Sequence, residues 1–342
     1  MKPVSIRDIA RQLNLSITTV SRALDGYPDV SNRTRLRILE TASELGYVPN
    51  QAARQLRRHK TDVLGFVLAS AQPKFADPFY TEFLSGLTDE ATAYGMDLRI
   101  SIASPDTDAE KNIYKRWSRS HEVDGIVLSH IRVHDWRVRF LQDEALPFVG
   151  FDKSEDGIDY PRCESNTHAS MLQIVSHLAQ NGYRRISFIG GPENYVSHQT
   201  NLEGFIHGLE QINFPLDPAY LVNGDFSSSS GYALTNKLLE LDPAPDAIVC
   251  ISDETAFGAL HALHEKKIIP GKDIAVTGFG GAQESKHSIP PLTTMDVPIY
   301  DITRQIVRIL MSVIQKEENI EHCIQVNPQL IIRETTMKEI SP

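Results

Sequence analysis

A run of short polar side chains that ends in an arginine lies near the N-terminus, at residues 16–22, whose sequence is Ser-Ile-Thr-Thr-Val-Ser-Arg. The run holds no acidic residue. Hydroxyl groups and a guanidinium can contact base edges in the major groove of DNA, where arginine pairs with guanine and threonine contacts polar edges or a thymine methyl group. This chemistry requires a helix that presents the polar side chains on one face.

The residues around this run predict three short helices. The first begins at Ile6, and the second is capped by Ser16. The third is capped by Ser31 and ends at Gly46. Two short helices joined by a brief turn, with a third behind them, form a helix-turn-helix unit. The alternative is a small helical protein-binding domain, but the polar, acid-free outer side of the second helix favours DNA.

The distribution of charge separates this N-terminal module from the remainder of the chain. Residues 1–60 hold eleven Lys or Arg and five Asp or Glu, a net charge of +6, whereas the whole chain carries −10, which leaves −16 for the other residues. A basic module attached to an acidic body is typical of a protein that binds nucleic acid through the basic part.

The composition describes an ordinary globular protein of two or three domains: 342 residues, of which 41% are hydrophobic and 23% charged. No apolar stretch is long enough to span a membrane or to form a secretory signal. Cys163, Cys250 and Cys323 lie far apart, so neither a disulfide framework nor a cysteine-rich zinc site is expected. We expect a soluble cytoplasmic protein that does not associate with membranes.

From residue 63 onward, short apolar segments alternate with longer amphipathic ones. Strands are predicted at 63–70, 97–103, 125–129, 147–152, 185–190, 220–224, 247–252 and 274–279, and helices between them, for example at 79–94, 166–181 and 254–266. This alternation predicts an α/β fold of parallel sheets covered on both faces, divided between two similar subdomains. Ligands in such folds bind at the carboxyl ends of the strands.

Aromatic and acidic residues follow several predicted strands. Phe79 follows the first strand, Asp152 ends the fourth, Phe226 follows the sixth, and Asp253 follows the seventh. Aromatic faces beside carboxylates suit a sugar, whose C–H faces stack while its hydroxyls form hydrogen bonds. Alternatives remain open, because Asp253 could instead cap the next helix, and Phe79 and Phe226 could simply pack in the core.

Signatures of catalysis, metal binding and cofactor binding are weak. Residues 278–281 lack the spacing of a dinucleotide-binding loop, and the chain has neither a phosphate-binding loop nor a nucleophile elbow. His261 and His264 share a helical face without a third ligand. Three further residues form only a loose group: His130, His134 and Asp135. We expect no catalytic residues, no metal and no cofactor.

Three motifs resemble the headpiece of the lactose-repressor (LacI) family: the segments at 6–10, 16–24 and 46–50. The resemblance continues through the whole chain. It implies an all-α helix-turn-helix headpiece at 1–49, a hinge helix or linker at 50–60, and a bilobed periplasmic-binding-protein-like core at 61–342. The implied lobes comprise 61–160 with 292–320, and 161–291 with 321–340, with crossings near residues 160, 290 and 320.

The resemblance also implies which residues contact DNA. In the second helix, Ile17, Thr18 and Arg22 would contact bases. Ser16, Thr19 and Ser21 would contact the backbone. In the hinge, Asn50, Ala53 and Leu56 would contact the minor groove, with Leu56 wedged between base pairs. Taken alone, the hinge segment could be a solvated linker. No leucine heptads follow residue 325, so we expect a homodimer on a pseudo-palindromic double-stranded operator.

The chain departs from the family at two ligand positions, with Asn201 in place of an arginine and Gly280 in place of an aspartate. A neutral saccharide, held by Asp152, Asn201, Asp253 and either His198 or Gln199, therefore fits better than an anion. Residues 135–149 resemble members that respond to α-glucosides or α-galactosides.

We therefore expect a sugar-controlled transcription regulator, a repressor of a carbohydrate-utilisation operon. The alternatives are a sugar-binding or transport protein and a sugar-metabolising α/β enzyme.

Overall fold

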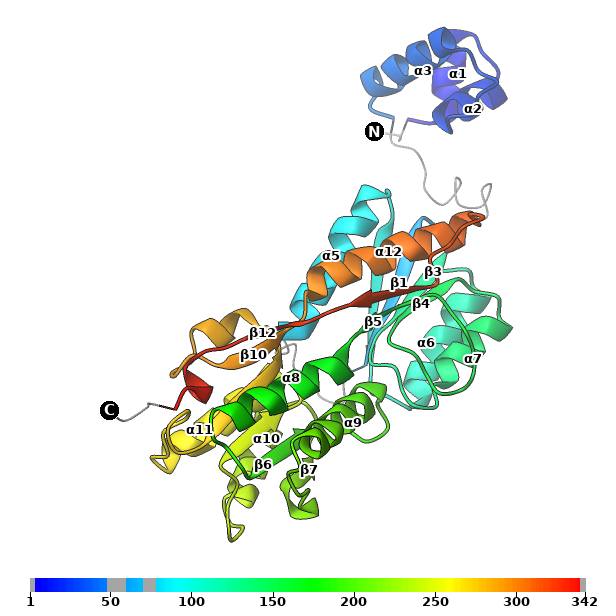
Figure 1. Ribbon diagram of the computed structural model, residues 1–342. Coiled ribbons are helices and arrows are strands. Elements are labelled where there is room, and N and C mark those ends of the chain that lie inside the picture. Colours follow the sequence, from blue (N-terminus) through cyan, green and yellow to red (C-terminus); the bar gives the residue numbers. More distant parts are fainter. Residues whose placement is uncertain (1–3, 48–59, 70–77, 339–342) are drawn as a thin grey trace. The chain divides into compact units, whose positions relative to one another are not determined.

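A computed structural model describes residues 4–47, 60–69 and 78–338 (Figure 1). The chain divides into two compact units, with the boundary between Thr61 and Asp62. Apart from Lys60, the hinge segment expected at 50–60 lies outside the described residues.

The N-terminal unit contains the three predicted helices, α1 (Ile6–Leu13), α2 (Ile17–Leu24) and α3 (Asn32–Glu44). At the start of α1 the Asp8 carboxylate accepts a hydrogen bond from the Ser5 amide at 2.9 Å, and α2 and α3 each begin at a serine that caps the helix. Ser16 Oγ accepts a hydrogen bond from the Thr19 amide at 3.0 Å, and Ser31 Oγ accepts one from the Thr34 amide at 3.2 Å. The small core consists of Ile9, Ala10, Val20, Ala23, Val30, Ile38 and Ala42. The helix-turn-helix prediction is confirmed.

The second unit contains two six-stranded sheets. The first has the order β11-β5-β4-β3-β1-β2 and comprises β1 (Val63–Ala69), β2 (Asp97–Ala103), β3 (Gly125–Leu128), β4 (Phe148–Phe151), β5 (Arg162–Ser165) and β11 (Cys323–Val326). The second has the order β12-β10-β9-β8-β6-β7 and comprises β6 (Ile186–Gly190), β7 (Leu221–Asn223), β8 (Ala247–Cys250), β9 (Ala275–Gly280), β10 (Thr293–Asp296) and β12 (Gln329–Ile331). All pairs are parallel except β10 with β12, which are antiparallel.

Helices cover both faces of each sheet. On the first sheet, one face packs against α5 (Pro78–Ala93) and α12 (Ile299–Gln315), and the other against α6 (Asp108–Arg119) and α7 (Trp136–Asp143). On the second, one face packs against α8 (Thr167–Gln180) and α9 (Val196–Gln211), and the other against α10 (Ser228–Leu238) and α11 (Asp253–Glu265). Short 3₁₀ helices lie at Pro218–Tyr220, Gln283–Lys286 and Glu334–Thr336.

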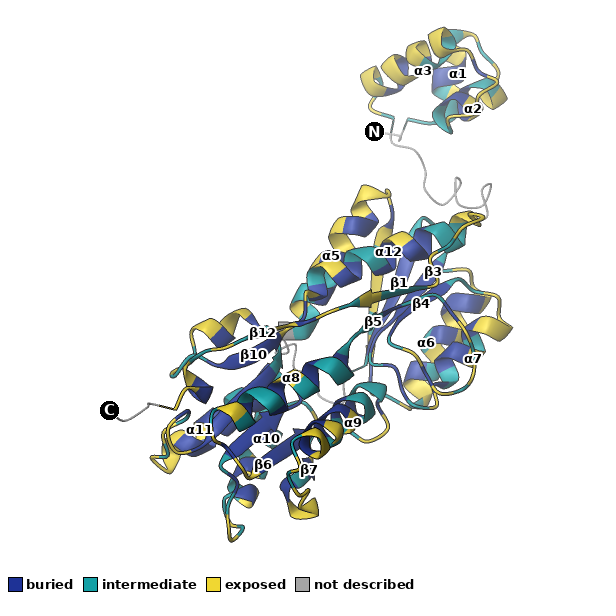
Figure 2. Cartoon of the chain, in the orientation of Figure 1, coloured by how far each residue is buried: buried dark blue, intermediate teal, exposed yellow. Residues whose placement is uncertain are grey.

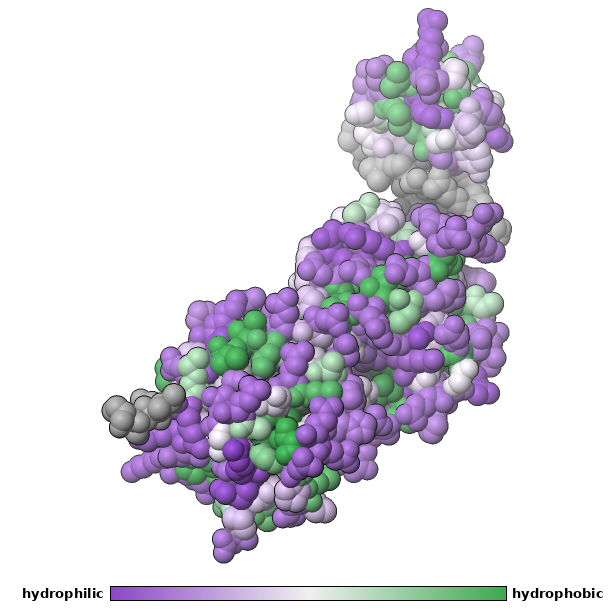
Figure 3. Space-filling view, in the orientation of Figure 1, coloured by the Kyte–Doolittle hydropathy of each residue, from purple (hydrophilic) through white to green (hydrophobic). Residues whose placement is uncertain are grey.

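The central strands, such as β1, β3, β4, β6 and β8, are buried between these helices and dark blue in Figure 2, whereas the edge strands β2, β11 and β12 are mostly intermediate or exposed. The face of the molecule seen in Figure 3 is mainly hydrophilic, interrupted by smaller apolar areas. The predicted two-subdomain α/β core is therefore confirmed.

The chain changes sheet three times, at positions that correct the expected lobe boundaries. The changes follow Ser165, Asp296 and Val326. Strands β5 and β11, expected in the second lobe, pair with each other in the first sheet. Strand β10, expected in the first lobe, pairs with β9 in the second sheet. The expected crossings near 160, 290 and 320 come several residues too early, because these short strands have no apolar run that marks them in the sequence.

Candidate functional sites

The outer face of α2 carries most of the side chains predicted to contact DNA. Ile17 is 47% exposed, and Ser16, Thr18 and Arg22 are also exposed, whereas Thr19 is half-buried. These side chains therefore share an accessible polar surface with one apolar member.

Ser21 does not belong to this exposed set. Its side chain is buried, and its hydroxyl donates a hydrogen bond to Asp25 Oδ2 at 3.4 Å, within the headpiece. The predicted backbone contact at Ser21 would therefore involve a mostly buried side chain. The three hinge residues predicted to contact DNA, Asn50, Ala53 and Leu56, lie outside the described residues.

A pocket lies between the two sheets of the core, at the carboxyl ends of the strands. Both lobes supply its lining. Of the residues predicted from the sequence, those that line it are Phe79, Asp152, Asn201, Phe226 and Asp253. The crossing segment before α12 contributes Val297, and α12 itself contributes Ile299. A bound ligand would therefore touch both lobes at once.

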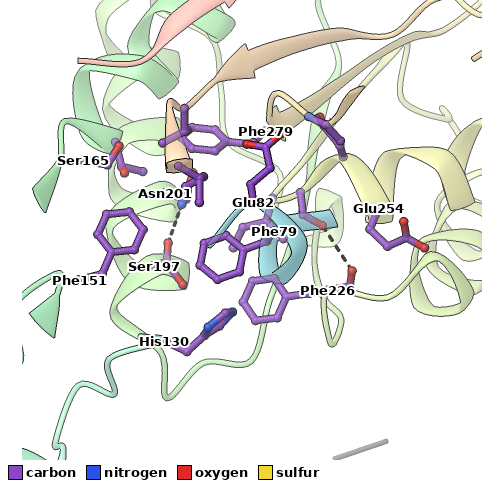
Figure 4. A pocket seen from close by; sticks show the side chains of 18 of the residues that line it. Phe79, Glu82, His130, Phe151, Ser165, Ser197, Asn201, Phe226, Glu254 and Phe279 are labelled. Carbon is purple, nitrogen blue, oxygen red and sulfur yellow. Dashed lines mark hydrogen bonds between the residues drawn. The ribbon is translucent and has the colours of Figure 1, made fainter. Parts of the chain in front are cut away.

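Aromatic rings form much of the pocket wall (Figure 4). Phe79 lies parallel to Phe151, with ring centroids 6.5 Å apart, and meets His130 edge-on at 5.0 Å. His130 in turn meets the ring of Phe226 edge-on at 5.9 Å. Phe79 also stacks on the buried Phe83 at 5.3 Å, so core packing and pocket lining, expected as alternatives, occur together at this residue.

Three pocket residues have strained backbone conformations. His130, Asp152 and Phe226 have positive φ angles of 47°, 81° and 67°, a region that L-residues other than glycine seldom adopt. Each follows the carboxyl end of a strand, β3, β4 or β7. Such strain costs about 1–3 kcal/mol per residue and is concentrated at binding sites. Here it is found at three residues that line the same pocket.

Asp152 places a carboxyl group in an apolar setting. Burial raises its pKa to about 7, and the neighbouring Glu164 carboxylate acts in the same direction. The group therefore exchanges its proton near neutral pH. A carboxyl group in this state can accept or donate a hydrogen bond to a ligand hydroxyl.

Asp253 is held by the protein itself. Its side chain is almost fully buried, Oδ1 accepts a hydrogen bond from Thr294 Oγ1 at 2.5 Å, and Oδ2 accepts one from the Ala282 amide at 2.6 Å. Burial raises its pKa to about 6. The helix cap is Ser252, whose Oγ accepts from the Thr255 amide, so the alternative that Asp253 caps α11 is wrong. Asp253 instead fixes the loop that forms one wall of the pocket.

Helix α9 supplies the expected Asn201 to the pocket, but its second residue there is Ser197 and neither His198 nor Gln199. His198 and Gln199 are absent from the lining, which contains Ser197 and Asn201. The buried His198 ring lies against Phe188, with centroids 6.3 Å apart, and burial lowers its pKa.

Asn201 offers an unused acceptor to the pocket. Its Nδ2 donates to the Ser197 carbonyl oxygen at 2.6 Å (dashed in Figure 4), while its buried Oδ1 has no hydrogen-bond partner among the residues that the structure describes. Because an unpaired buried oxygen is unfavourable, a ligand donor at this point would gain a ready partner.

His130 is a pocket residue that sequence reasoning did not include in the site. Burial lowers its pKa to about 4, with Arg137 and Arg132 contributing, so the ring is neutral at neutral pH. Its position just after the third predicted strand is the signal that could have found it, because Asp152 and Phe226 occupy comparable positions after other strands. Other lining residues outside the prediction are Glu82, Phe151, Ser165, Thr167, Ser197, Ile251, Ser252, Glu254, Phe279, Gly280, Ala282, Val297 and Ile299.

The two lobes also meet through backbone beside this pocket. Arg132 and Tyr195 form an isolated antiparallel bridge between the segments that follow β3 and β6. The Val133 amide donates to the Asn194 carbonyl oxygen at 2.9 Å, and the Val196 amide donates to the Ile131 carbonyl oxygen at 3.0 Å. This bridge lies two residues from His130, so the pocket wall and the contact between lobes are parts of one segment.

Buried ion pairs fix the same segment within the first lobe. Arg132 Nη2 lies 2.8 Å from Glu110 Oε1, and Arg137 Nη2 lies 2.6 Å from Asp135 Oδ2, all four side chains being buried. Asp135 also caps α7. Such paired charges hold a segment in one arrangement, because separating them would leave an uncompensated buried charge.

Among the described residues, no group of three or more histidine, cysteine or acidic side chains is arranged to hold a metal ion. His261 pairs with Glu265 instead, at 3.4 Å. Within the described part of the chain, no helix is long and apolar enough to cross a membrane.

Comparisons with known proteins agree with the two-part architecture. Residues 5–50 match the family described as bacterial regulatory proteins, lacI family, and residues 175–336 match a periplasmic binding protein-like domain. The chain is 30% identical over 334 residues to catabolite control protein A of Priestia megaterium, covering 97% of this chain and 99% of that protein. It is 31% identical to the regulator AglR of Rhizobium meliloti over 297 residues, covering 85% and 83% of the two chains.

Solved structures give the same result for the fold. The lac repressor dimer bound to operator and the anti-inducer ONPF aligns with a TM-score of 0.85 and 24% identity, covering 98% of this chain and all of that chain. The complex of the regulator CelR with cellobiose aligns with a TM-score of 0.75 and 25% identity, covering 97% and 99%. The headpiece and the two-lobed core thus define a helix-turn-helix transcription regulator with a periplasmic-binding-protein-like ligand domain. The chain belongs to the LacI family.

Proposed function

We propose that the protein represses a carbohydrate-utilisation operon in the cytoplasm, and that a small neutral saccharide in the interlobe pocket controls it. The observation that carries the ligand proposal is the pocket itself. Aromatic faces of Phe79, Phe151 and Phe226 stand beside the hydrogen-bonding groups of Asp152 and Asn201. Sugars offer both a C–H face that stacks and hydroxyls that form hydrogen bonds. The cellobiose in the CelR complex, a neutral disaccharide, supports the same ligand class.

In this proposal, a homodimer binds a pseudo-palindromic operator, and each protomer places its α2 in one half-site. The exposed residues of α2 supply base contacts through Ile17, Thr18 and Arg22, and backbone contacts through Ser16 and Thr19. Asn50, Ala53 and Leu56 act in the minor groove. The charge of +6 on residues 1–60 supports attraction to the phosphates.

Control by the sugar follows from the position of the pocket. A ligand that contacts Asp152 in one lobe and Asn201 in the other binds with an affinity that depends on how the lobes are placed. By linkage, binding then changes the relative populations of lobe placements. Residues beside the bridge between Arg132 and Tyr195 transmit this change within the core.

Two measurements test the proposal. Operator sequences selected from a random duplex library are titrated by fluorescence anisotropy against a scrambled duplex, and specific binding is expected to exceed nonspecific binding roughly a thousandfold. The titration is repeated with maltose, trehalose, melibiose and cellobiose, together with a uronate and a sugar phosphate. A shift caused by a neutral disaccharide supports the proposal, and an α-linked one would support an α-glucoside or α-galactoside. A shift with the anions alone contradicts the proposed ligand class.

The same experiments separate the alternatives. A sugar-binding or transport protein would bind a sugar without any preference for a DNA sequence, and a sugar-metabolising enzyme would consume the sugar during incubation. Absence of sequence preference in the wild-type protein would overturn the regulator proposal.

A further inference from the structure

Arg22 on α2 is held by two side chains from the turn that follows the helix. Its Nε lies 2.8 Å from Asp29 Oδ2, and its guanidinium carbon lies 4.7 Å from the centroid of the Tyr27 ring. One contact is an ion pair and the other a cation–π interaction. Together they restrict a side chain that would otherwise sample many rotamers.

The turn that supplies these contacts is itself fixed to the headpiece. Arg35 on α3 donates from Nη2 to the Tyr27 carbonyl oxygen at 2.5 Å, and the Tyr27 amide donates to the Arg22 carbonyl oxygen at 3.0 Å. Val30, at the end of the turn, is buried in the headpiece core. Asp29 therefore stands at a defined place beside α2.

The geometry leaves the outer end of the guanidinium available. Asp29 engages Nε, so the two Nη groups can still pair with the O6 and N7 atoms of one guanine. We propose that Asp29, assisted by Tyr27, positions Arg22 for this bidentate contact and so sets the preference for guanine at one base pair of each half-site. The inference rests on the proposed role of α2 in operator binding.

This role differs from a contribution to stability. The Arg22 and Asp29 side chains are 44% and 53% exposed, and exposed ion pairs contribute little to folding. Asp29 also brings a negative charge towards the phosphates, which opposes nonspecific binding. Its removal should therefore weaken discrimination between bases while leaving nonspecific binding unchanged or stronger. A purely structural role predicts a different result: the unfolding temperature falls, and DNA affinity falls equally whichever base pair is changed.

The test compares full-length Asp29→Asn with the wild type on the selected operator. Arg22→Ala first identifies the base pair that Arg22 recognises, as the one at which that variant loses its preference. At that base pair, the wild type should prefer guanine by about ten- to hundredfold. Asp29→Asn should lower this preference by at least about fivefold, with less than twofold change at other base pairs and an unchanged unfolding midpoint.

Two further comparisons sharpen the result. Replacing the guanine by 7-deazaguanine, which lacks N7, should weaken wild-type binding more than Asp29→Asn binding. Tyr27→Phe keeps the ring and should behave as wild type, whereas Tyr27→Ala should lose part of the preference. The matched control is Glu40→Gln on the exposed side of α3, which removes an equal charge from the headpiece and should leave the preference intact.

The outcomes distinguish the inference from the function on which it rests. If the wild type selects no preferred sequence, the proposed function fails. If the wild type discriminates and Asp29→Asn discriminates equally well, the function stands and the positioning role is overturned. A uniform loss of affinity across all base pairs, with a lower unfolding midpoint, also overturns it.

Discussion

The headpiece and the interlobe pocket place their functional side chains in opposite settings. On α2, Thr18 and Arg22 are exposed and belong to regular helical geometry. In the pocket, Asp152 and Phe226 follow strand ends in strained backbone conformations and stand among aromatic rings. A DNA surface must be accessible to a large rigid partner, whereas a pocket for a small ligand must exclude water and fix a few contacts. The two sites can therefore be disrupted separately.

The largest separation is expected at the hinge. Leu56→Gly removes the side chain proposed to wedge between base pairs, so operator affinity should fall on the order of a hundredfold. Sugar affinity should stay within about twofold of wild type, because the proposed role of Leu56 is confined to DNA. Anisotropy and calorimetric titrations measure the two affinities. Undiminished operator binding would remove Leu56 from the interface.

Asp152→Ala should produce the opposite pattern. Loss of a hydrogen bond to a carboxylate should weaken sugar binding by about ten- to hundredfold, while operator affinity without sugar remains at the wild-type value. Asp159→Ala is the matched control, because Asp159 lies in the same loop between β4 and β5 but is exposed. If both variants bind sugar like the wild type, Asp152 is not a ligand contact.

A smaller effect is expected on stability as the pH changes. The pKa of Asp152 is raised from 3.8 to about 7, so the folded core favours the protonated form and loses stability as the pH rises through this range. The pKa of His130 is lowered to about 4, so this residue makes the folded core lose stability as the pH falls below about 6.5. Its contribution is common to wild type and Asp152→Asn.

As the pH rises from 4 to 7, the unfolding temperature of Asp152→Asn should therefore increase relative to that of the wild type. Calorimetry at a series of pH values measures this difference. A difference that does not change with pH would contradict the burial of an ionising group at Asp152.

The smallest effect tests the predicted DNA contact of Ser21. Because its hydroxyl is buried and bonded to Asp25, Ser21→Ala should change operator affinity by less than about twofold. Thr18→Ala, on the exposed side of the same helix, should cost more, on the order of 1 kcal/mol. A larger loss at Ser21 than at Thr18 would restore Ser21 as a DNA contact.

The strands that sequence reasoning predicted are those with continuous apolar runs. Strand β1 is almost wholly buried, and its composition alone identifies it. Strands β5 and β10 have only four residues each, with sequences Arg-Cys-Glu-Ser and Thr-Thr-Met-Asp. Such segments carry no periodic signal, and their place is decided by the neighbours with which they pair. The lobe boundaries were misplaced for this reason.

The pocket residues that were predicted correctly are mainly those that directly follow a strand. Asp152 and Phe226 follow strands and line the pocket. On α9 the prediction of Asn201 agrees with the pocket lining, but its companion was chosen wrongly: Ser197 lies four residues before Asn201 on the same face, while His198 is rotated about 100° from Ser197. Gly190, which leaves space for the His198 ring, becomes apparent only in three dimensions.

The three changes of sheet have a consequence for synthesis on the ribosome. Strand β11 pairs with β5 in the first sheet, and β12 pairs with β10 in the second, so neither sheet is complete until residues 323–331 have emerged. The headpiece, whose contacts are local, can fold while most of the core is still being translated. A nascent chain can thus expose a folded DNA-binding module before its regulatory body exists. A chain that is stalled or truncated before residue 323 would carry a folded headpiece joined to two incomplete sheets.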